Sequence, residues 1–149
     1  MYADDEIALR PREYYGPSRT IHCDHSMIFD IVDLAQACVA GEIALRMGDS
    51  AELFYLGHIG YHVDAPFQGR HYALKACRLC EPLPAGLGAR SLIITTDPDN
   101  FPSARTCERL GCTLESTVKV PPELAQRLEI SLLKRRYLWE LSPRLVSAP

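Results

Sequence analysis

The stretch Gly57-His-Ile-Gly-Tyr-His-Val-Asp-Ala-Pro-Phe-Gln-Gly-Arg-His-Tyr-Ala73 predicts a strand, a tight loop and the start of a helix in immediate succession. Apolar Ile59, Tyr61 and Val63 alternate at period two, and from Gly69 onward the spacing becomes helical. The first amides of such a helix have no acceptor within it, and the helix dipole adds a positive potential. The loop is therefore a candidate anion site of the kind that binds a nucleotide or coenzyme.

The composition predicts a single globular domain. The chain has 149 residues, 47% of them hydrophobic, and no linker-like stretch divides it. We expect an irregular segment over residues 1–25, a domain over 26–142 and a tail over 143–149. The net charge of -3 argues against a broad electrostatic surface for nucleic acid or acidic lipid. The absence of an apolar leader or of a membrane-spanning run makes a cytoplasmic location the default expectation.

Six cysteines in a chain without an export signal are expected to be reduced thiols rather than a disulfide framework. The pair in Cys77-Arg-Leu-Cys80 falls near the end of a predicted helix, whereas a redox pair gains its low pKa at a helix N-terminus. Core packing is the favoured interpretation of this pair. The cluster His22-Cys-Asp-His25 is compact enough for a metal, but solvated surface is the commoner outcome, so we predict no metal site.

The remaining elements predict a mixed sheet. Strands are expected over Ser26–Asp33, Ala37–Met47 and Leu53–Val63, as an antiparallel run, with a short strand at Glu6–Leu9. The helix from Gly69 to Glu81, ended by Pro82 and Pro84, then leads to an apolar strand at Ser91–Thr96 in a parallel β-α-β crossover. A short helix over about Phe101 to Leu110, an amphipathic segment from Glu123 to about Leu133, and closing strands at Cys112–Val120 and Arg135–Leu141 complete the α/β domain.

Two separated motifs resemble those of the GNAT superfamily of acyl-CoA-dependent N-acyltransferases. After Val63, the run Gln68-Gly-Arg-His-Tyr-Ala73 matches the opening Gln and closing Ala of that family's coenzyme-phosphate loop, and His71 stands where glycine is usual. The second motif is Asn100-Phe-Pro-Ser-Ala-Arg-Thr-Cys-Glu-Arg-Leu-Gly111, which is similar to the family's Asn-x-x-Ser helix ending in Glu-x-x-Gly. The order and spacing of both motifs carry the resemblance. Their style is nearest to the branch that includes ribosomal-protein N-terminal acetyltransferases.

The resemblance implies an N-acetyltransferase that uses acetyl-CoA and a primary amine, either a peptide N-terminus or a small molecule. Direct attack of the amine on the thioester is expected, without an acyl-enzyme. The coenzyme would contact Asn100 and Ser103 of the second motif and the loop residues Val63, Gln68, Gly69, Arg70, His71, Tyr72 and Ala73. Arg70, Lys75 and Arg105 are candidates for added positive charge, although a solvated helix face explains each equally well.

Ser103 is the first candidate for a hydroxyl at the coenzyme sulfur, and Asn100 either contacts the coenzyme or only caps its helix. The family's tyrosine acid would fall at Cys107, which is a candidate replacement or simply a buried residue. His58, Tyr61 and His62 are candidates for the base, with Glu42 and a water chain as alternatives.

The departures from the family pattern allow a rival interpretation. An ordinary right-handed helix start would accommodate His71 without the freedom of glycine, but the altered loop, the absent tyrosine and the short N-terminal region also fit a catalytically weak acyl-CoA-binding or regulatory module. The early helices of the family are reduced here, so the acceptor site is expected to be open or completed by another subunit. Late strands such as Arg135–Leu141 would suit a homodimer. A dinucleotide oxidoreductase is disfavoured because no GxGxxG motif follows a first strand.

Overall fold

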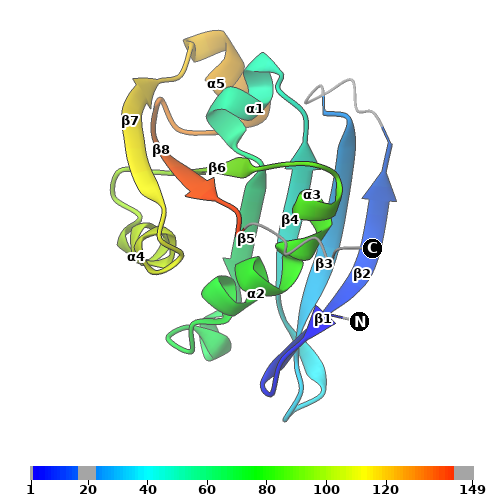
Figure 1. Cartoon of the computed structure of the whole chain (residues 1–149). Helices are drawn as coiled ribbons and strands as arrows, with labels where there is room; N and C mark the ends of the chain where they lie inside the picture. The colour runs from blue at the N-terminus through cyan, green and yellow to red at the C-terminus, as the bar shows by residue number, and fades with distance from the viewer. Residues whose placement is uncertain (1, 17–22, 143–149) are drawn as a thin grey trace.

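A computed structural model describes residues 2–16 and 23–142 of the chain. Within these ranges, eight strands form one sheet in the order β1-β2-β3-β4-β5-β6-β8-β7 (Figure 1). The strands are β1 (Tyr2–Ala3), β2 (Ile7–Tyr15), β3 (His25–Asp33), β4 (Cys38–Met47), β5 (Ile59–Val63), β6 (Ser91–Thr96), β7 (Thr113–Lys119) and β8 (Leu133–Glu140). The helices are α1 (Ala51–Leu56), α2 (Tyr72–Cys80), α3 (Pro82–Gly86), α4 (Phe101–Arg109) and α5 (Pro122–Leu128), with a 3-10 turn, η1, at Ala65–Phe67.

The N-terminal segment is more regular than the sequence predicts. The expectation of an irregular stretch over residues 1–25 is wrong, because Ile7–Tyr15 pairs with β3 along its whole length. Pro11 is tolerated because it adjoins a bulge and because β1 pairs only with Ala8 and Leu9, which leaves this half of β2 at the sheet edge. The core-forming part of the chain therefore begins at Ile7.

The predicted hairpin of β3 and β4 is confirmed, with Asp33 paired to Cys38 at its turn. The strand predicted over Leu53–Val63 is half wrong, because its first part is helix α1. The Ser50 hydroxyl caps α1 by accepting from the Leu53 amide at 3.3 Å, and Gly57 ends it with φ 84°. Only Ile59–Val63 remains as strand β5.

The β-α-β crossover is confirmed, and its two parallel strands separate quickly. Strands β5 and β6 share one register pair, Ile59 with Ile94, whereas every other pairing in the sheet is antiparallel. Beyond that pair the strands diverge, as Figure 1 shows, and α2 follows β5 while α4 follows β6. The carboxyl ends of β5 and β6 and the starts of both helices thus surround one gap in the sheet.

The closing strands lie in an order that the sequence did not predict. Strand β8 pairs with both β6 and β7, and its Tyr137 and Trp139 are buried. The exposed strand is β7, at the edge of the sheet. The expectation that Arg135–Leu141 offers an exposed edge to a second subunit is therefore wrong.

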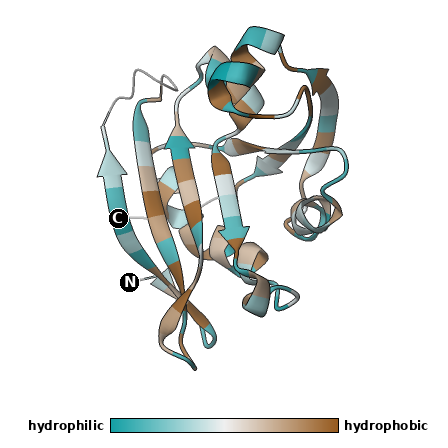
Figure 2. Cartoon of the chain, turned by 180° about the vertical axis from the view of Figure 1, so that it is seen from behind, coloured by the Kyte–Doolittle hydropathy of each residue, from teal (hydrophilic) through white to brown (hydrophobic). Residues whose placement is uncertain are grey.

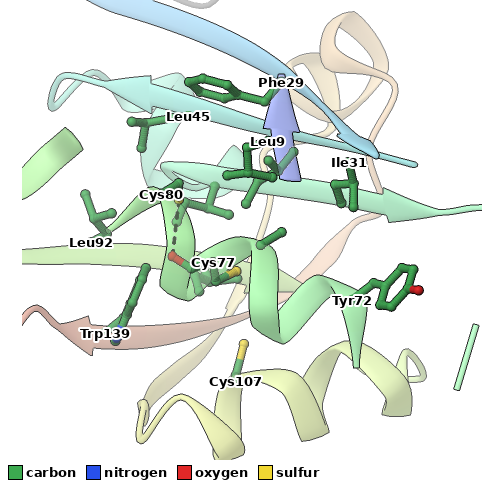
Figure 3. Packing of buried hydrophobic residues seen from close by; sticks show 14 of the residues in the cluster. Leu9, Phe29, Ile31, Leu45, Tyr72, Cys77, Cys80, Leu92, Cys107 and Trp139 are labelled. Atoms are coloured by element: carbon green, nitrogen blue, oxygen red, sulfur yellow. Dashed lines mark hydrogen bonds between the residues drawn. The ribbon is translucent and has the colours of Figure 1, made fainter. Parts of the chain in front are cut away.

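The core lies between the sheet and helix α2. Ile31 and Leu45 of the sheet pack in one buried cluster with Cys77 of the helix (Figure 3). Ile43 and Ala76 belong to the same cluster, and all five residues are at most 1% exposed. All six cysteines are free thiols. Burial raises the pKa of the Cys77 thiol well above its ordinary value and raises the pKa of Cys80 to about 12, so this pair packs as apolar side chains.

The opposite face of strands β2–β5 is not covered by a helix of the described chain (Figure 2). A polar row runs across it in register: Arg10 lies opposite Asp30, Asp30 opposite Glu42, and Glu42 opposite His62. Within residues 2–16 and 23–142, every helix falls short of the length and apolarity needed to cross a bilayer. The sheet therefore has one helix-covered face and one polar face.

Candidate functional site

The loop between β5 and α2 is held in a conformation that most residues avoid. Gly69 has φ +85°, and His71, the N-cap of α2, has φ 61° and ψ 28°. The expectation of a right-handed helix start at His71 is wrong, because this residue adopts the left-handed conformation that glycine adopts most readily. The side-chain amide of Gln68 supports the loop by donating to the carbonyl oxygen of Val63 at 3.0 Å. The backbone thus takes a path suited to glycine although histidine stands there.

The loop exposes a series of unused backbone donors. Within the described chain, the N–H groups of Gly69 through Leu74 have no protein acceptor, and the first amide of this region that is bonded is Lys75, which donates to the His71 carbonyl at 3.0 Å. Six consecutive free donors at the positive end of a nine-residue helix form a strong anion site. This geometry fits the anion site that the sequence predicts.

Four of these six residues, Gly69, His71, Tyr72 and Ala73, line a cavity of about 530 Å³ between α2 and α4. Its walls come from the end of β5, the loop and the first turns of both helices. The lining residues are Tyr61, His62, Val63, Phe67, Gln68, Gly69, His71, Tyr72, Ala73, Asn100, Pro102, Ser103, Arg105, Thr106 and Arg109. The two motifs identified in the sequence are thereby brought together on opposite walls.

Helix α4 presents Ser103 to the cavity floor. The Asn100 side chain caps α4 by accepting from the Ser103 amide at 3.2 Å, which leaves the Ser103 hydroxyl free to point toward β5. There it lies 2.8 Å from the hydroxyl of Tyr61. Burial raises the pKa of Tyr61 well above its ordinary value, so the phenol stays protonated at neutral pH.

Cys107 lies behind this hydroxyl pair and does not line the cavity. Its side chain is fully buried, and a hydrogen bond with Cys112, together with burial, raises its pKa. A protonated, enclosed thiol fits the packing interpretation of Cys107 rather than that of an acid replacing tyrosine. The hydroxyl nearest to Ser103 comes instead from Tyr61, on a different element.

His58 lies outside the cavity. Its Nδ1 accepts from the Ile93 amide at 2.9 Å, so its Nε2 carries the proton and donates to the Gly48 carbonyl at 2.8 Å. Burial lowers the pKa of this imidazole. Both ring nitrogens thus join the turn after β4 to strand β6, and the structure separates His58 from the other candidate site residues.

His62 occupies the cavity rim on the polar side of the sheet. Its side chain is 68% exposed, and Nε2 lies 3.3 Å from the Asp64 carboxylate. Glu42, its cross-strand neighbour, is ion-paired with Arg12 at 2.5 Å. Of the two histidines considered as candidate bases, His58 and His62, it is His62 whose ring is accessible from the cavity.

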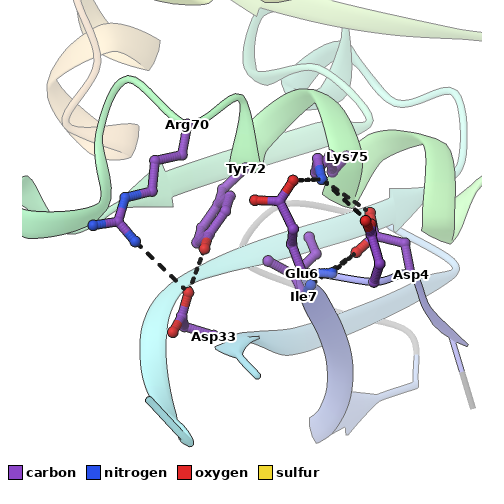
Figure 4. Close-up of polar contacts among 8 residues, drawn as sticks. Asp4, Glu6, Ile7, Asp33, Arg70, Tyr72 and Lys75 are labelled. Carbon is purple, nitrogen blue, oxygen red and sulfur yellow. Dashed lines mark hydrogen bonds and ion pairs between the residues drawn. The ribbon is translucent and has the colours of Figure 1, made fainter. Parts of the chain in front are cut away.

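Two basic residues near the loop, Lys75 and Arg70, lie close to carboxylates of the fold (Figure 4). Lys75 contacts the carboxylates of Asp4, Asp5 and Glu6, at 3.6, 3.9 and 2.5 Å. Arg70 lies 4.0 Å from Asp33 and over the ring of Phe67. Both side chains point away from the cavity and stabilise the fold.

The positive charge in the cavity comes from α4. Arg105 and Arg109 line it, and among the described residues neither is within ion-pair distance of a carboxylate. Arg109 was not identified from the sequence, where it is only a basic residue in the last turn of the second motif. The cavity is thus electropositive although the chain has a net charge of -3.

The start of α2 is fixed by a buried carboxylate. The Tyr72 hydroxyl donates to Asp33 at the end of β3, and the Gln36 amide donates to the same carboxylate at 2.9 Å (Figure 4). These donors lower the pKa of Asp33, with the Tyr72 hydrogen bond as the largest cause. The loop donors are thereby held in place before any ligand binds.

No group of three metal-ligating side chains occurs within the described residues. Of the cluster His22-Cys-Asp-His25, His22 lies outside the described residues. The ring of His25 shares a hydrogen bond with the Tyr14 hydroxyl at 2.7 Å.

Solved structures share this fold. MccE, a microcin C7 self-immunity acetyltransferase solved with acetyl-CoA and AMP, is 24% identical and has a TM-score of 0.60, over 78% of this chain and 61% of its own. A ribosomal L7/L12 alpha-N-protein acetyltransferase, RimL, solved with coenzyme A, is 22% identical with a TM-score of 0.60, over 78% and 62%. The ribosomal-protein-S5-alanine acetyltransferase from Vibrio fischeri is 18% identical with a TM-score of 0.60, over 79% and 64%. The chain thus spans about six tenths of the length of these proteins.

A comparison with curated proteins found no match. The acetyltransferase (GNAT) domain family, in contrast, matches residues 5–113, which is most of the chain and includes strands β2–β6, the β5–α2 loop and helix α4. The predicted fold class is confirmed by the shared architecture, and the two motifs lie on facing walls of one cavity. This chain belongs to the GNAT acetyltransferase family.

Proposed function

We propose that this protein binds acetyl-CoA in the cavity between α2 and α4 and transfers its acetyl group to a primary amine. The observation that carries the proposal is the row of six unused N–H donors, Gly69 through Leu74, at the head of α2. Such a row fits the oxygens of a pyrophosphate, and the guanidinium groups of Arg105 and Arg109 add charge on the facing wall. The donor set therefore fits a phosphorylated coenzyme.

The reaction needs a thioester carbonyl held close to an amine. The amine nitrogen forms a bond to the carbonyl carbon, the carbon–sulfur bond breaks, and coenzyme A leaves as a thiolate that takes up one proton. Divergence of β5 and β6 after Ile59 and Ile94 leaves unpaired strand ends beside the cavity, where backbone groups can position the thioester. Positioning of the two reactants supplies most of the expected rate enhancement.

Ser103 and Tyr61 are assigned to the leaving thiolate. Their hydroxyl oxygens are 2.8 Å apart on the cavity floor, and the buried phenol remains protonated. Tyr61 is thus a protonated phenol that orients Ser103 through their shared hydrogen bond, rather than a base that removes a proton from the amine. The pair replaces the tyrosine acid that the family motif would place at Cys107.

His62 is assigned as the proton acceptor for the amine. His58 is excluded because both of its nitrogens hold the fold, and Glu42 is already paired with Arg12. The His62 ring lies at the rim of the cavity, and Asp64 lies on its other side, where it can stabilise the protonated ring.

The acceptor is proposed to be a peptide or protein N-terminus, with a small amine as the alternative. Support comes from the polar sheet face beside His62, which no helix of the described chain covers (Figure 2). Two of the structural neighbours are named as ribosomal-protein N-acetyltransferases. An extended peptide can reach the rim from this open face.

The test is acetyl-CoA-dependent thiol release with a panel of peptides and small amines. We expect turnover by the natural sequence, and a loss of about 100–1,000-fold in kcat for Ser103→Ala and His62→Gln, within the range attributed to single donors and acid–base groups. Thr117→Ala, on the far edge strand β7, is the matched control and should retain full activity. Loss of activity in His62→Gln should be reduced at high pH, where the free amine is abundant.

Two outcomes separate the rival functions. Tight binding of acetyl-CoA with no turnover on any acceptor would favour a binding or regulatory module, a role consistent with burial of Cys107 at the position of the family's tyrosine. Absence of any acetyl-CoA binding would contradict both the proposed activity and that alternative.

A further inference from the structure

We propose that His71 and Arg109 form a side-chain clamp for a phosphate of the coenzyme, so that histidine at the position usually held by glycine strengthens binding instead of impairing it. The inference rests on the proposed function, since it concerns how the same cavity holds its ligand.

The two side chains meet across the cavity. Nη1 of Arg109, in the last turn of α4, lies 3.0 Å from both Nδ1 and Nε2 of His71, at the N-cap of α2. Both residues line the cavity, His71 from the N-cap position of α2 and Arg109 from the last turn of α4. Their contact links the walls on which the two sequence motifs lie.

Arg109 has donors to spare. A guanidinium carries five N–H donors, and the contact with His71 uses only Nη1. Basic side chains such as Lys75, Arg127 and Lys134 have a carboxylate partner, whereas Arg109 has none among the described residues. An electropositive donor that faces six free backbone N–H groups is arranged for an anion with several oxygens.

The His71 ring is compatible with the same role. In the neutral imidazole the ring nitrogen that accepts from Arg109 has no proton and the other nitrogen carries an N–H, which can donate to a phosphate oxygen once the ligand is bound. The backbone N–H of His71 is also unused. Main chain and side chain of one residue thus offer donors to the same ligand.

Because of the left-handed conformation of His71, the clamp and a mere loop defect predict opposite changes in coenzyme affinity for His71→Gly. With φ 61°, a non-glycine residue is disfavoured, so His71→Gly should relieve backbone strain and raise the melting temperature. If histidine were only a defect in the loop, the same substitution would also tighten coenzyme binding. The clamp requires the opposite: His71→Gly is more stable and yet binds coenzyme A more weakly.

The experiment is calorimetric titration of the full chain with coenzyme A and with 3′-dephospho-coenzyme A, together with thermal melts. We expect Kd for coenzyme A to rise about tenfold in His71→Gly, in His71→Asn, which tolerates the left-handed conformation, and in Arg109→Gln. Arg90→Gln, which removes an exposed charge before β6 and away from the cavity, is the matched control. The double variant should bind no more weakly than either single variant, because each already disrupts the clamp.

The ligand analogue shows which phosphate is held. If the penalty of Arg109→Gln disappears with 3′-dephospho-coenzyme A, the clamp holds the 3′-phosphate; if the penalty persists, the clamp holds the pyrophosphate. Unchanged or tighter binding in His71→Gly, or an Arg109→Gln variant indistinguishable from Arg90→Gln, would overturn the clamp while leaving the proposed function intact. Failure of the natural sequence to bind coenzyme A would instead overturn the proposed function.

Discussion

Tyr61 and His58 lie three positions apart in the stretch that decides the fold, yet they act in different parts of the molecule. Tyr61 belongs to β5 and reaches the hydroxyl of Ser103 at the cavity floor. His58 precedes β5 and joins the Gly48 carbonyl to the Ile93 amide. In the sequence both are candidate site residues. Only the folded chain shows that the His58 ring bonds to backbone groups and stabilises the fold.

The buried imidazole predicts a loss of stability in mild acid. Burial lowers the pKa of His58 below its ordinary 6.5, so the unfolded chain takes up a proton at a pH where the folded protein does not. Stability is therefore complete above pH about 6.5 and falls as the pH drops below that value toward the folded pKa. Urea unfolding at pH 7.5 and pH 5.5 measures this difference.

Substitution of His58 separates the stability that its hydrogen bonds provide from the pH dependence that its buried imidazole causes. His58→Gln should lose about 1–2 kcal/mol of unfolding free energy at pH 7.5, because an amide cannot reproduce both hydrogen bonds at the same spacing. The drop between pH 7.5 and 5.5 should become shallower. In His62→Gln, which removes an exposed ring, the drop should persist, and a drop that vanished there would contradict the assignment to His58.

The pairing of β4 and β5 depends on close backbone contact at one glycine. A Cβ atom at Gly41 would overlap the carbonyl oxygen of His62 and would lie 2.9 Å from the Cα atom of Val63. Because these neighbours are backbone atoms, they can move only if β5 moves. Gly41 thus fixes the position of the strand that carries both Tyr61 and His62.

Substitution at this glycine should damage stability and binding together. We predict that Gly41→Ala loses about 1–3 kcal/mol of unfolding free energy, as overpacked interiors do, and that its affinity for coenzyme A falls because the end of β5 shifts. Gly16→Ala, with no heavy atom within 4 Å of the added Cβ, should change stability by no more than about 0.5 kcal/mol. Equal stability of the two variants in chemical denaturation would show that the β4–β5 contact is not tight.

The elements differ in how far sequence predicts them. The phosphate loop and α4 are defined by local turn and capping residues, such as Gln68 and Asn100, and both motifs occur where predicted. Strand β2 was underestimated because Pro11 normally opposes a strand, and its tolerance depends on the edge position that only the assembled sheet creates. Helix α1 was missed because its apolar residues continue the alternation of β5, although the Ser50 cap signals its start.

The parts of the site that could not be predicted all depend on contacts between distant segments. The Tyr61–Ser103 hydrogen bond requires β5 and α4 to pack, and the His71–Arg109 contact requires the last turn of α4 to lie over the start of α2. Neither spacing is visible along the chain. The left-handed backbone at His71 was likewise unpredicted, since its residue type favours the ordinary helical conformation.

Across the protein, the two faces of the sheet differ in what covers them. Helices α2 and α3 cover one face and enclose the core (Figures 1 and 3), while the polar row from Arg10 to His62 lies on the open face. The cavity lies where β5 and β6 separate, between the helix-covered face and the open polar face. For the proposed function, we infer that the coenzyme enters from the helical side and the amine approaches from the open side.

The central claim is that the head of α2 binds the coenzyme phosphates, and amide chemical shifts test it most directly. In a ¹H–¹⁵N NMR titration with coenzyme A, we expect the largest shifts at the N–H groups of Gly69 through Leu74, because these donors are unbonded in the free protein. Ser103 and Arg109 should shift as well. Saturating coenzyme A that leaves the amides of Gly69 through Leu74 unmoved, or that shifts amides elsewhere instead, would contradict the account.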